Sequence, residues 1–325
     1  MNDWLQALKE GRRRALAQAI TQIEAEGEGA HATLAALYPL AGRAHHVGVT
    51  GAAGAGKSTL VNALARALRA SGRTVGIVAV DPSSPFTGGA LLGDRIRMRD
   101  LAGDPGVFIR SMASRGQLGG LARTTADVAV ALDAAGFDVV IIETAGAGQG
   151  DVDIARAAHT TVVVEAPGMG DSVQAIKAGV LEIADVLALN KADHPDAAAA
   201  ANALRAMLEL GARDREGWQP PLIKTIAPEG AGVDALLDAI DAHREHLNHS
   251  GALAARERAR VEAEITARLR AALLDRALAQ LGRDGLADAV ARVLARQEDP
   301  QSAALRLIAS MGDDAAPGAP RRPGD

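Results

Sequence analysis

Apolar positions follow two different periods along this chain of 325 residues. Between residues 44 and 247, short apolar runs alternate with stretches in which apolar residues recur every three or four positions. The runs predict buried strands and the recurring positions predict helices, an alternation typical of a mostly parallel sheet covered on both faces. Strands are expected at residues 47–50, 74–80, 137–142, 161–165, 185–189 and 221–225. The pattern therefore predicts an α/β fold.

Helical periodicity alone marks both ends of the chain. Residues 1–43 carry apolar side chains at helical spacing, and residues 252–311 do so over a longer stripe that contains Ile265 and Leu269. Gly282 predicts a break in the second stretch. The stripe can pack against its own domain or against the same stripe of a second subunit, so both packing within the chain and an isologous dimer stay open.

A glycine-rich octapeptide lies between the first strand and the first helix of the central region. It runs from Gly51 to Ser58 with the sequence GAAGAGKS, which fits the pattern G-x-x-x-x-G-K-[ST] of phosphate-binding loops. Glycines let backbone N–H groups close around phosphates, and the start of the following helix, expected at residues 59–68, adds partial positive charge. Lys57 is expected to reach the β- and γ-phosphates, and the Ser58 hydroxyl to coordinate Mg²⁺. The spacing predicts a nucleoside triphosphate site.

A second motif identifies the base. Asn190, Lys191, Ala192 and Asp193 follow the strand expected at 185–189, at the edge where open α/β sheets bind ligands. An aspartate there accepts hydrogen bonds from N1–H and the exocyclic amine of guanine, a pair of donors that adenine does not present. Asn190 is expected to connect this base loop with the phosphate loop, and the Lys191 stem to lie along the base. The motif predicts a guanine nucleotide.

Two carboxylates follow other strands at the same edge. Asp81 ends the strand expected at 74–80, and Glu143 ends the strand expected at 137–142. Hard oxygen ligands of this kind suit Mg²⁺. Gly146 lies in the sequence ETAG, which resembles the D-x-x-G switch of GTPases and can offer its N–H to the γ-phosphate. The expected catalytic residues are therefore Lys57, Asp81, Glu143 and Gly146.

Longer segments around these motifs carry a more specific resemblance. DPSSPFTGG (81–89), LGDRIRM (92–98), QLGG (117–120) and ETAGAGQ (143–149), taken together, resemble the MeaB/ArgK-type family of P-loop GTPases over roughly residues 10–310. Members of that family are G-protein chaperones of adenosylcobalamin-dependent acyl-CoA mutases. The resemblance implies a dimeric GTPase that gates cobalamin delivery to a mutase of methylmalonyl-, isobutyryl- or 2-hydroxyisobutyryl-CoA type and protects that mutase.

The resemblance also implies roles for individual residues. Asp94 joins the set expected to hold Mg²⁺, which becomes Ser58, Asp81, Asp94 and Glu143. The residues expected to bind nucleotide are Gly51, Ala53, Gly54, Ala55, Gly56, Lys57, Ser58, Thr59, Asn190, Lys191, Asp193 and Ala227. The segment 166–174 matches a third switch-like loop that contacts the mutase. Hydrolysis is expected to be slow until the mutase stimulates it, because neither a Ras-type glutamine nor an arginine finger can be assigned.

Pattern and resemblance together divide the chain into four parts. They are an N-terminal helical extension (1–43), a GTPase domain (44–247), a C-terminal helical dimerisation arm (248–311) and a disordered tail (312–325). The expected fold is a P-loop NTPase with GTP or GDP and Mg²⁺ as ligands. No mutase barrel is present and the base-off cobalamin motif D-x-H-x-x-G is missing, so the mutase is expected to act in trans.

Composition narrows the function classes. The net charge is −5 and no basic stripe interleaves with aromatic residues, which argues against a nucleic-acid partner. The chain has no cysteine, which excludes disulfides and thiolate zinc sites and fits a reducing compartment. No apolar stretch approaches the ~18 residues of a membrane span, and the start of the chain shows no signal region. A cytoplasmic protein without a membrane partner is expected.

Two other classes of function stay open on the sequence alone. A GTP-dependent metal-insertion chaperone has a related fold, but that class normally carries a histidine-rich tract or a cysteine motif, whereas the eight histidines here are scattered. Only His45 and His46 are adjacent, and they are expected to precede a strand. A small-molecule kinase shares the phosphate loop but needs an acceptor pocket and a base, and the guanine motif counts against it. A mutase chaperone is the leading hypothesis.

Overall fold

The computed structural model of the chain describes residues 3–81, 100–101, 103–113, 124–144, 157–168, 182–211 and 217–312. The chain divides into two compact units, Met1–Glu257 and Arg258–Asp325. The four-part division with boundaries at residues 43, 247 and 311 stays a prediction. None of the helices in the described ranges is long and apolar enough to cross a membrane.

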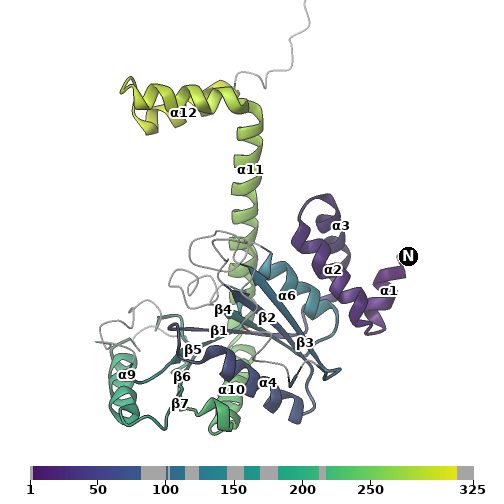
Figure 1. Cartoon of the computed structure of the whole chain (residues 1–325), viewed down its shortest axis with the longest axis vertical. Helices are drawn as coiled ribbons and strands as arrows, with labels where there is room; N and C mark the ends of the chain where they lie inside the picture. The colour runs from purple at the N-terminus through teal and green to yellow at the C-terminus, as the bar shows by residue number, and fades with distance from the viewer. Residues whose placement is uncertain are drawn as a thin grey trace, which may run out of the picture. The chain divides into compact units, whose positions relative to one another are not determined.

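A parallel sheet forms the centre of the first unit (Figure 1). Within the described residues it has seven strands in the order β3-β2-β4-β1-β5-β6-β7, and each neighbouring pair is parallel. The strands are β1 (His45–Gly51), β2 (Val75–Asp81), β3 (Val107–Ala113), β4 (Val139–Thr144), β5 (Thr160–Glu165), β6 (Val186–Leu189) and β7 (Leu222–Lys224). The predicted α/β fold is confirmed, and β3 is an edge strand that the pattern did not predict.

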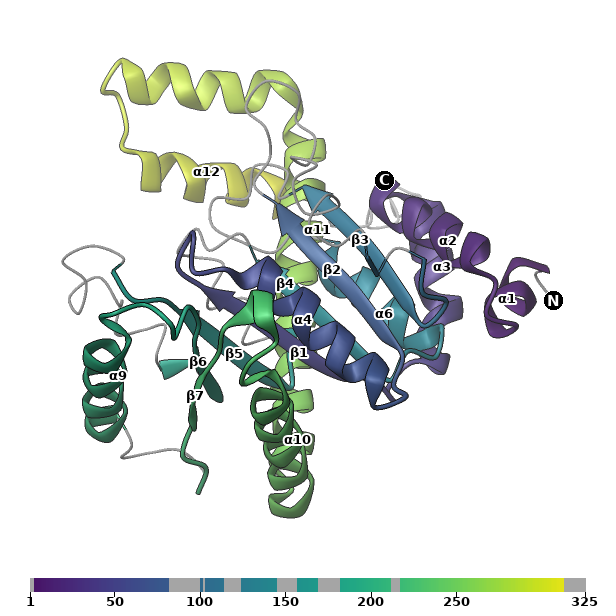
Figure 2. The same ribbon diagram turned by 60° about the horizontal axis from the view of Figure 1, so that its bottom comes forward.

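Helices cover both faces of this sheet (Figure 2). Their bounds are α1 (Asp3–Lys9), α2 (Arg13–Ala25), α3 (Glu28–Leu37), α4 (Lys57–Ala70), α6 (Thr125–Ala134), α9 (Ala197–Gly211) and α10 (Val233–Ser250), with 3-10 turns η1 (Tyr38–Leu40) and η3 (Ala227–Glu229). α4 and α10 share one core with the sheet, and α1, α2 and α6 share the core on the opposite face. α9 packs beside β5 and β6.

Periodicity explains why α4 forms where it does. Leu60, Leu64 and Leu68 recur every fourth residue and are at most 2% exposed, so one face of the helix is buried. The strand β4 alternates instead: Ile141 lies in the core under α4, whereas Ile142 lies in the core on the other face. The two periods that predicted the elements therefore also decide which core each side chain enters.

The N-terminal helices are part of the first unit's core. Leu16, Ile20 and Ile23 of α2 are buried together with Val78 of β2 and Val140 of β4. An ion pair between Arg110 of β3 and Glu24 of α2 adds a polar contact at the edge of the sheet. These helices cover β2, β3 and β4 on the face opposite α4.

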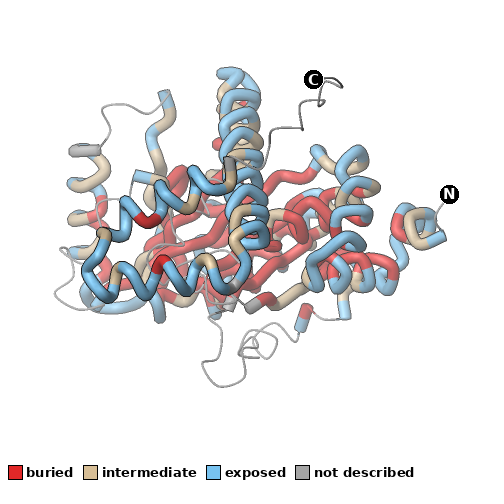
Figure 3. Tube along the Cα trace, turned by 90° about the horizontal axis from the view of Figure 1, so that it is seen from above, coloured by how far each residue is buried: buried red, intermediate tan, exposed pale blue. Residues whose placement is uncertain are grey.

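The second unit contains most of α11 (Ala252–Leu294) and all of α12 (Pro300–Gly312). Ile265, Leu269 and Leu273 on α11 are 56–60% exposed, and Figure 3 shows long exposed stretches along both helices. Gly282 has non-helical angles (φ 63°, ψ −178°), which confirms the predicted break. α12 starts where Asp299 Oδ1 accepts the Gln301 N–H. The unit therefore carries apolar side chains that it does not bury itself.

His45 and His46 are the first two residues of β1, so the expectation that they precede the strand is wrong. His45 lies opposite Val139 in the ladder with β4, and its Nε2 is 2.9 Å from the Thr160 hydroxyl. Both histidines are at most 5% exposed. Because a neighbouring hydroxyl satisfies the His45 ring, an imidazole is tolerated inside the strand.

A buried polar network continues from His45 across the amino edge of the sheet. The Thr160 hydroxyl is also 2.8 Å from His243 Nδ1, and His243 Nε2 is 3.3 Å from Asp185 Oδ1. Arg256, near the start of α11, donates to both oxygens of Asp185 at 2.9 and 3.0 Å. The network joins β1, β5, α10 and the start of α11 around one carboxylate.

Acidification is expected to destabilise this network. Burial lowers the pKa of His243 to about 4, with Arg256 and His246 adding repulsion and Asp185 opposing the shift. The pKa of His243 in the folded protein lies below its value of 6.5 in the unfolded chain, so between pH 4 and pH 6.5 the unfolded state binds more protons than the folded state. His243 alone should therefore lower the unfolding free energy by about 1.4 kcal/mol per pH unit as the pH drops from 6.5 toward 4. Urea unfolding followed by circular dichroism measures it.

The control for this pH effect lies on the same helix. His249 is exposed near the end of α10, and the His249→Gln protein should keep the full pH dependence. The His243→Asn protein should show a shallower slope over the same range. A slope that is identical in both variants would contradict the assignment to His243.

Candidate nucleotide site

The glycine-rich loop connects the end of β1 with the start of α4, in the strand–loop–helix order that the motif requires. Gly51 has φ +133° and Gly56 has φ +92°, conformations that residues with side chains rarely adopt. A Cβ at Gly51 would collide with the Val164 carbonyl oxygen of β5, and one at Gly56 would lie 2.5 Å from Asn190 Nδ2. Glycine at both positions lets the loop backbone approach its neighbours closely.

Lys57 places a cation against this loop. It is the first residue of α4 and is 7% exposed. Its Nζ donates to the carbonyl oxygens of Gly51 and Ala52, each at 3.0 Å. The ammonium group is therefore held at the loop, next to the positive end of the α4 dipole. A preorganised cation beside a helix N-terminus is an arrangement suited to phosphate groups.

Ser58, in the first turn of α4, and Glu143, near the end of β4, are in contact. The Ser58 hydroxyl donates to Glu143 Oε1 at 2.6 Å, and the two residues are 7% and 4% exposed. Their meeting follows from the alternation along β4, which directs Glu143 to the same face as Ile141, where α4 packs. The pair brings a hydroxyl and a carboxylate oxygen together at the carboxyl edge of the sheet.

The base loop is joined to the phosphate loop by Asn190. Asn190 is 2% exposed, and its Nδ2 donates to the Ala55 carbonyl oxygen at 2.9 Å. Lys191 Nζ donates to the Gly54 carbonyl oxygen at 3.0 Å, and Lys191 has a positive φ of 56°. The expected connection between the two loops is present. Asp193 is exposed two residues further on, beside the same edge of the sheet.

Thr225 is a supporting residue that the sequence analysis did not single out. Its hydroxyl donates to Asn190 Oδ1 at 3.2 Å, and the Ala227 backbone N–H donates to the same oxygen at 3.1 Å. Thr225 is fully buried directly after β7. The available sequence signal for Thr225 was its position at the end of a predicted strand. Its partner Asn190 follows the neighbouring strand β6, and the sequence alone does not show that these two strands pair. These bonds fix the amide of Asn190 from the side opposite the phosphate loop.

Several predicted site residues are not described. Asp94 and Gly146 lie outside the described residues, and so does the side chain of Asp81, although β2 ends at that residue as expected. The described residues contain no group of three or more His, Asp or Glu side chains arranged to hold a metal ion. In the described part, the predicted metal set is represented by Ser58 and Glu143.

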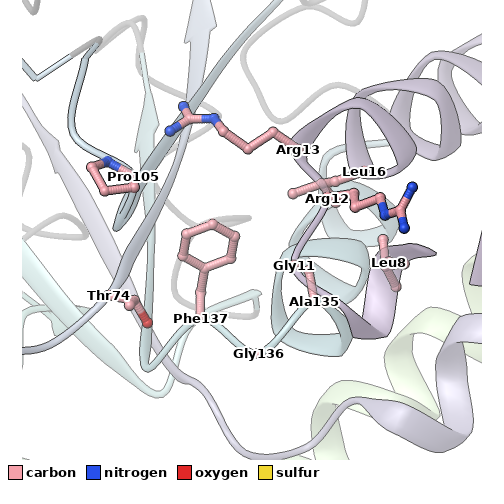
Figure 4. A pocket seen from close by; sticks show the side chains of 10 residues that line it. All are labelled: Leu8, Gly11, Arg12, Arg13, Leu16, Thr74, Pro105, Ala135, Gly136 and Phe137. Carbon is pink, nitrogen blue, oxygen red and sulfur yellow. The ribbon is translucent and has the colours of Figure 1, made fainter. Parts of the chain in front are cut away.

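A small pocket lies at the opposite edge of the sheet. Figure 4 shows Phe137 facing the turn between α1 and α2, with Arg12, Arg13 and Leu16 around a cavity of about 180 Å³. Arg13 is already engaged, because its Nη1 donates to the Asp104 carbonyl oxygen at 2.8 Å. Phe137 precedes β4, so the pocket lies at amino ends of strands and is separate from the candidate nucleotide site.

Comparison with known proteins places the chain in a family. Residues 16–281 match the family described as methylmalonyl-CoA mutase-associated GTPase MeaB. The chain belongs to the MeaB family of GTPases. Among MeaB relatives, a Pyrococcus abyssi protein is 47% identical over 95% of this chain and 96% of its own length. The GTPase ArgK of Escherichia coli is 39% identical over 77% of each chain. A crystal structure of a LAO/AO transport system kinase, 27% identical, has a TM-score of 0.75 and covers 96% of this chain and 99% of its own.

Membership of the MeaB family establishes the activity at a general level. This MeaB-family chain is a P-loop GTPase that binds guanine nucleotide, so the predicted family, fold class and hydrolytic activity are confirmed. The roles given to single residues in binding nucleotide or metal stay predictions.

Proposed function

We propose that this protein is a cytoplasmic, GTP-hydrolysing chaperone that gates adenosylcobalamin delivery to a cobalamin-dependent acyl-CoA mutase and protects that mutase. The mutase is a separate chain of methylmalonyl-, isobutyryl- or 2-hydroxyisobutyryl-CoA type. Membership of a family described as associated with methylmalonyl-CoA mutase supports the partner class. The hydrogen bond from Asn190 to the phosphate loop supports a nucleotide-dependent function, because it connects the loop proposed to bind the base with the loop proposed to bind the phosphates.

The proposed phosphate site uses the loop from Gly51 to Thr59, including Ala53, together with Lys57. Lys57 would transfer its hydrogen bonds from the loop carbonyls to the β- and γ-phosphates, where its charge offsets the negative charge that develops during hydrolysis. Asn190 and Lys191 would hold the base loop in place, and Asp193 would accept from the guanine edge. The backbone at Ala227 completes the proposed base site.

Mg²⁺ fits the oxygen donors at this site. Ser58 and Glu143 bring a hydroxyl and a carboxylate within 2.6 Å, and such hard oxygen atoms are the ligands that Mg²⁺ prefers. We assign the ion to these two residues together with Asp81 and Asp94. When bound, Mg²⁺ would neutralise charge on the β- and γ-phosphate oxygens. The Ser58–Glu143 hydrogen bond orients both oxygens before the ion binds.

The proposed mutase-contacting segments begin at the edge of the sheet where the proposed nucleotide site lies. β2 ends at Asp81, β4 at Thr144 and β5 at Glu165, and the strands are parallel. The segments that follow these strands, including the predicted switch-like loop 166–174, therefore start on the nucleotide side. Loops in that position can respond to the γ-phosphate and present the response to a partner.

We also propose that a second copy of the chain covers the apolar stripe of α11. Ile265, Leu269 and Leu273 recur at a spacing of four residues, and each is more than half exposed. A contiguous exposed apolar stripe on one helix is typical of a surface that another chain buries. An isologous contact lets the same stripe serve both subunits.

Coupling between nucleotide and mutase is the expected signature of the chaperone. A non-hydrolysable GTP analogue should bind the mutase complex with an affinity different from that for the free protein, by ~1–3 kcal/mol, and by linkage should change mutase affinity by the same factor. GDP should show a smaller coupling. Titration calorimetry with and without a verified cognate mutase measures both affinities, and phosphate release measures whether the mutase accelerates hydrolysis.

The Lys57→Ala protein is the control for this experiment, since it should bind the mutase without nucleotide-dependent change. If nucleotide affinity and hydrolysis rate are both indifferent to the mutase, the chaperone function is wrong. The GTPase activity would then belong to a protein that acts without this partner.

A further inference from the structure

Two buried threonines join the strands that lead into the phosphate loop and into the predicted switch at Gly146. The hydroxyls of Thr50, in β1, and Thr144, in β4, are 3.0 Å apart. Thr50 is fully buried and Thr144 is 4% exposed. Thr50 directly precedes Gly51, the first residue of the phosphate loop, and Thr144 is the last residue of β4. The hydrogen bond therefore lies at the carboxyl ends of β1 and β4, directly before the phosphate loop.

The backbone ladder between these strands ends just before the pair. β1 and β4 pair from His45 to Val49 on one strand and from Val139 to Glu143 on the other. Beyond that point Thr50 is in register with Val163 of β5, and Thr144 with Val80 of β2. Within the described residues, each threonine thus belongs to a ladder on its outer side. The side-chain bond continues the connection between β1 and β4 where the ladder between them ends.

The pair lies on the opposite face of the sheet from Ser58. Val49 belongs to the core under α4, and Glu143 bonds to Ser58 of that helix. Because successive side chains of a strand point to opposite faces, Thr50 and Thr144 point away from α4. The end of β4 is therefore joined to the phosphate-loop region on both faces of the sheet, by the Glu143–Ser58 bond on one face and the Thr144–Thr50 bond on the other.

We infer that Thr50 and Thr144 are positioning residues for GTP hydrolysis, which set the distance between the phosphate loop and the carboxyl end of β4, where Glu143 bonds to Ser58. Neither side chain needs to touch the nucleotide, because Thr50 acts through Gly51, the next residue of the phosphate loop, and Thr144 acts through its neighbour Glu143, which bonds to Ser58. The inference rests on the proposed assignment of the phosphate site to the loop from Gly51 to Ser58. A displacement of about 1 Å between reacting groups can lower a rate by about 10²-fold. Loss of a short hydrogen bond at this position is therefore expected to lower the rate of GTP hydrolysis strongly.

Valine tests the pair because it keeps the shape of threonine without the hydroxyl. In the Thr144→Val protein we expect kcat for GTP to fall at least ~10-fold, while the Kd for GDP stays within about twofold. Thr144→Ser keeps a hydroxyl and should recover most of kcat. The readouts are steady-state phosphate release, GDP titration calorimetry and urea unfolding.

The double variant separates positioning from stability. Thr50→Val combined with Thr144→Val removes both hydroxyls of the pair, so the Thr144 hydroxyl no longer faces a methyl group and the unfolding midpoint should lie above that of the Thr50→Val protein. Two methyl groups still pack at roughly 3.5–4.0 Å rather than 3.0 Å, so the strand ends stay displaced and kcat should stay low. A kcat that recovers together with stability would overturn the inference.

Thr160→Val is the matched control in the same sheet. Thr160 is fully buried in β5, at the amino edge, and its hydroxyl contacts His45 and His243. This variant should lose stability and keep kcat. The inference is wrong if kcat in Thr144→Val stays within about twofold of the unmodified protein, or if kcat follows the unfolding midpoint across all variants, Thr160→Val included. Normal hydrolysis by the Lys57→Ala protein would instead refute the underlying assignment of the phosphate site.

Discussion

The Lys57→Ala protein is expected to lose at least about 10²-fold in kcat/KM for GTP and to bind GTP weakly, with its fold intact. The ammonium group is held at the phosphate loop by the carbonyl oxygens of Gly51 and Ala52, each 3.0 Å away. Removing it takes a preorganised cation from the place where negative charge develops. Phosphate release and nucleotide titration measure the effect, and circular dichroism checks the fold.

Two further variants show whether the charge is responsible. Lys57→Met keeps the buried hydrocarbon stem and removes only the ammonium group, so its loss should match that of Lys57→Ala. Lys9→Ala removes a lysine at the end of α1 and should leave hydrolysis unchanged. Wild-type turnover in the Lys57→Ala protein would falsify the assignment of the phosphate loop.

Elements with a strong local pattern were predictable from the sequence. The helix after the phosphate loop was expected at residues 59–68 and is α4, Lys57–Ala70, because its buried leucines recur every fourth residue. Continuous apolar runs identified β1, β2 and β4 to within a few residues. These signals are local, since burial on both faces of a parallel sheet demands apolar residues at every position.

The edge strand β3 escaped prediction for a related reason. Its sequence VFIRSMA breaks the apolar run with Arg110 and Ser111, because an edge strand is less completely covered than a central one. Arg110 instead pairs with Glu24, a residue far away in the sequence. An ion pair with a distant helix leaves no local signal that would mark the segment as a strand.

Within the site, residue types were predictable and their partners were not. The motif identified Asn190 as a connector, but the acceptor, Ala55, and the supporting Thr225 follow from how two loops and β7 meet. The bond between Thr50 and Thr144 depends on the register of strands that lie about ninety residues apart. Sequence motifs report groups that act on a ligand, whereas the residues that position them are set by tertiary contacts.

The Asp193→Asn protein is expected to lose affinity for GTP by roughly 10⁴-fold and to gain affinity for xanthosine triphosphate. A carboxylate accepts from both N1–H and the exocyclic amine of guanine, whereas an amide turns one acceptor into a donor that faces the amine. Xanthine carries a carbonyl oxygen at C2, which accepts from that donor. Asn190 and Lys191 hold the loop through the Ala55 and Gly54 carbonyl oxygens, so the substitution should leave the position of the loop unchanged.

Asp196→Asn is the matched control for this specificity change. Asp196 lies three residues beyond Asp193, its side chain is 71% exposed, and its carboxylate is 3.7 Å from His194. The same loss of charge there should leave the preference for GTP intact, which excludes a general electrostatic effect. Competition titrations with GTP, xanthosine triphosphate and ATP measure the preference. Equal competition by ATP and GTP in the unmodified protein, or an unchanged preference in Asp193→Asn, would show that another residue recognises the base, because an aspartate that pairs with guanine has to be sensitive to this exchange.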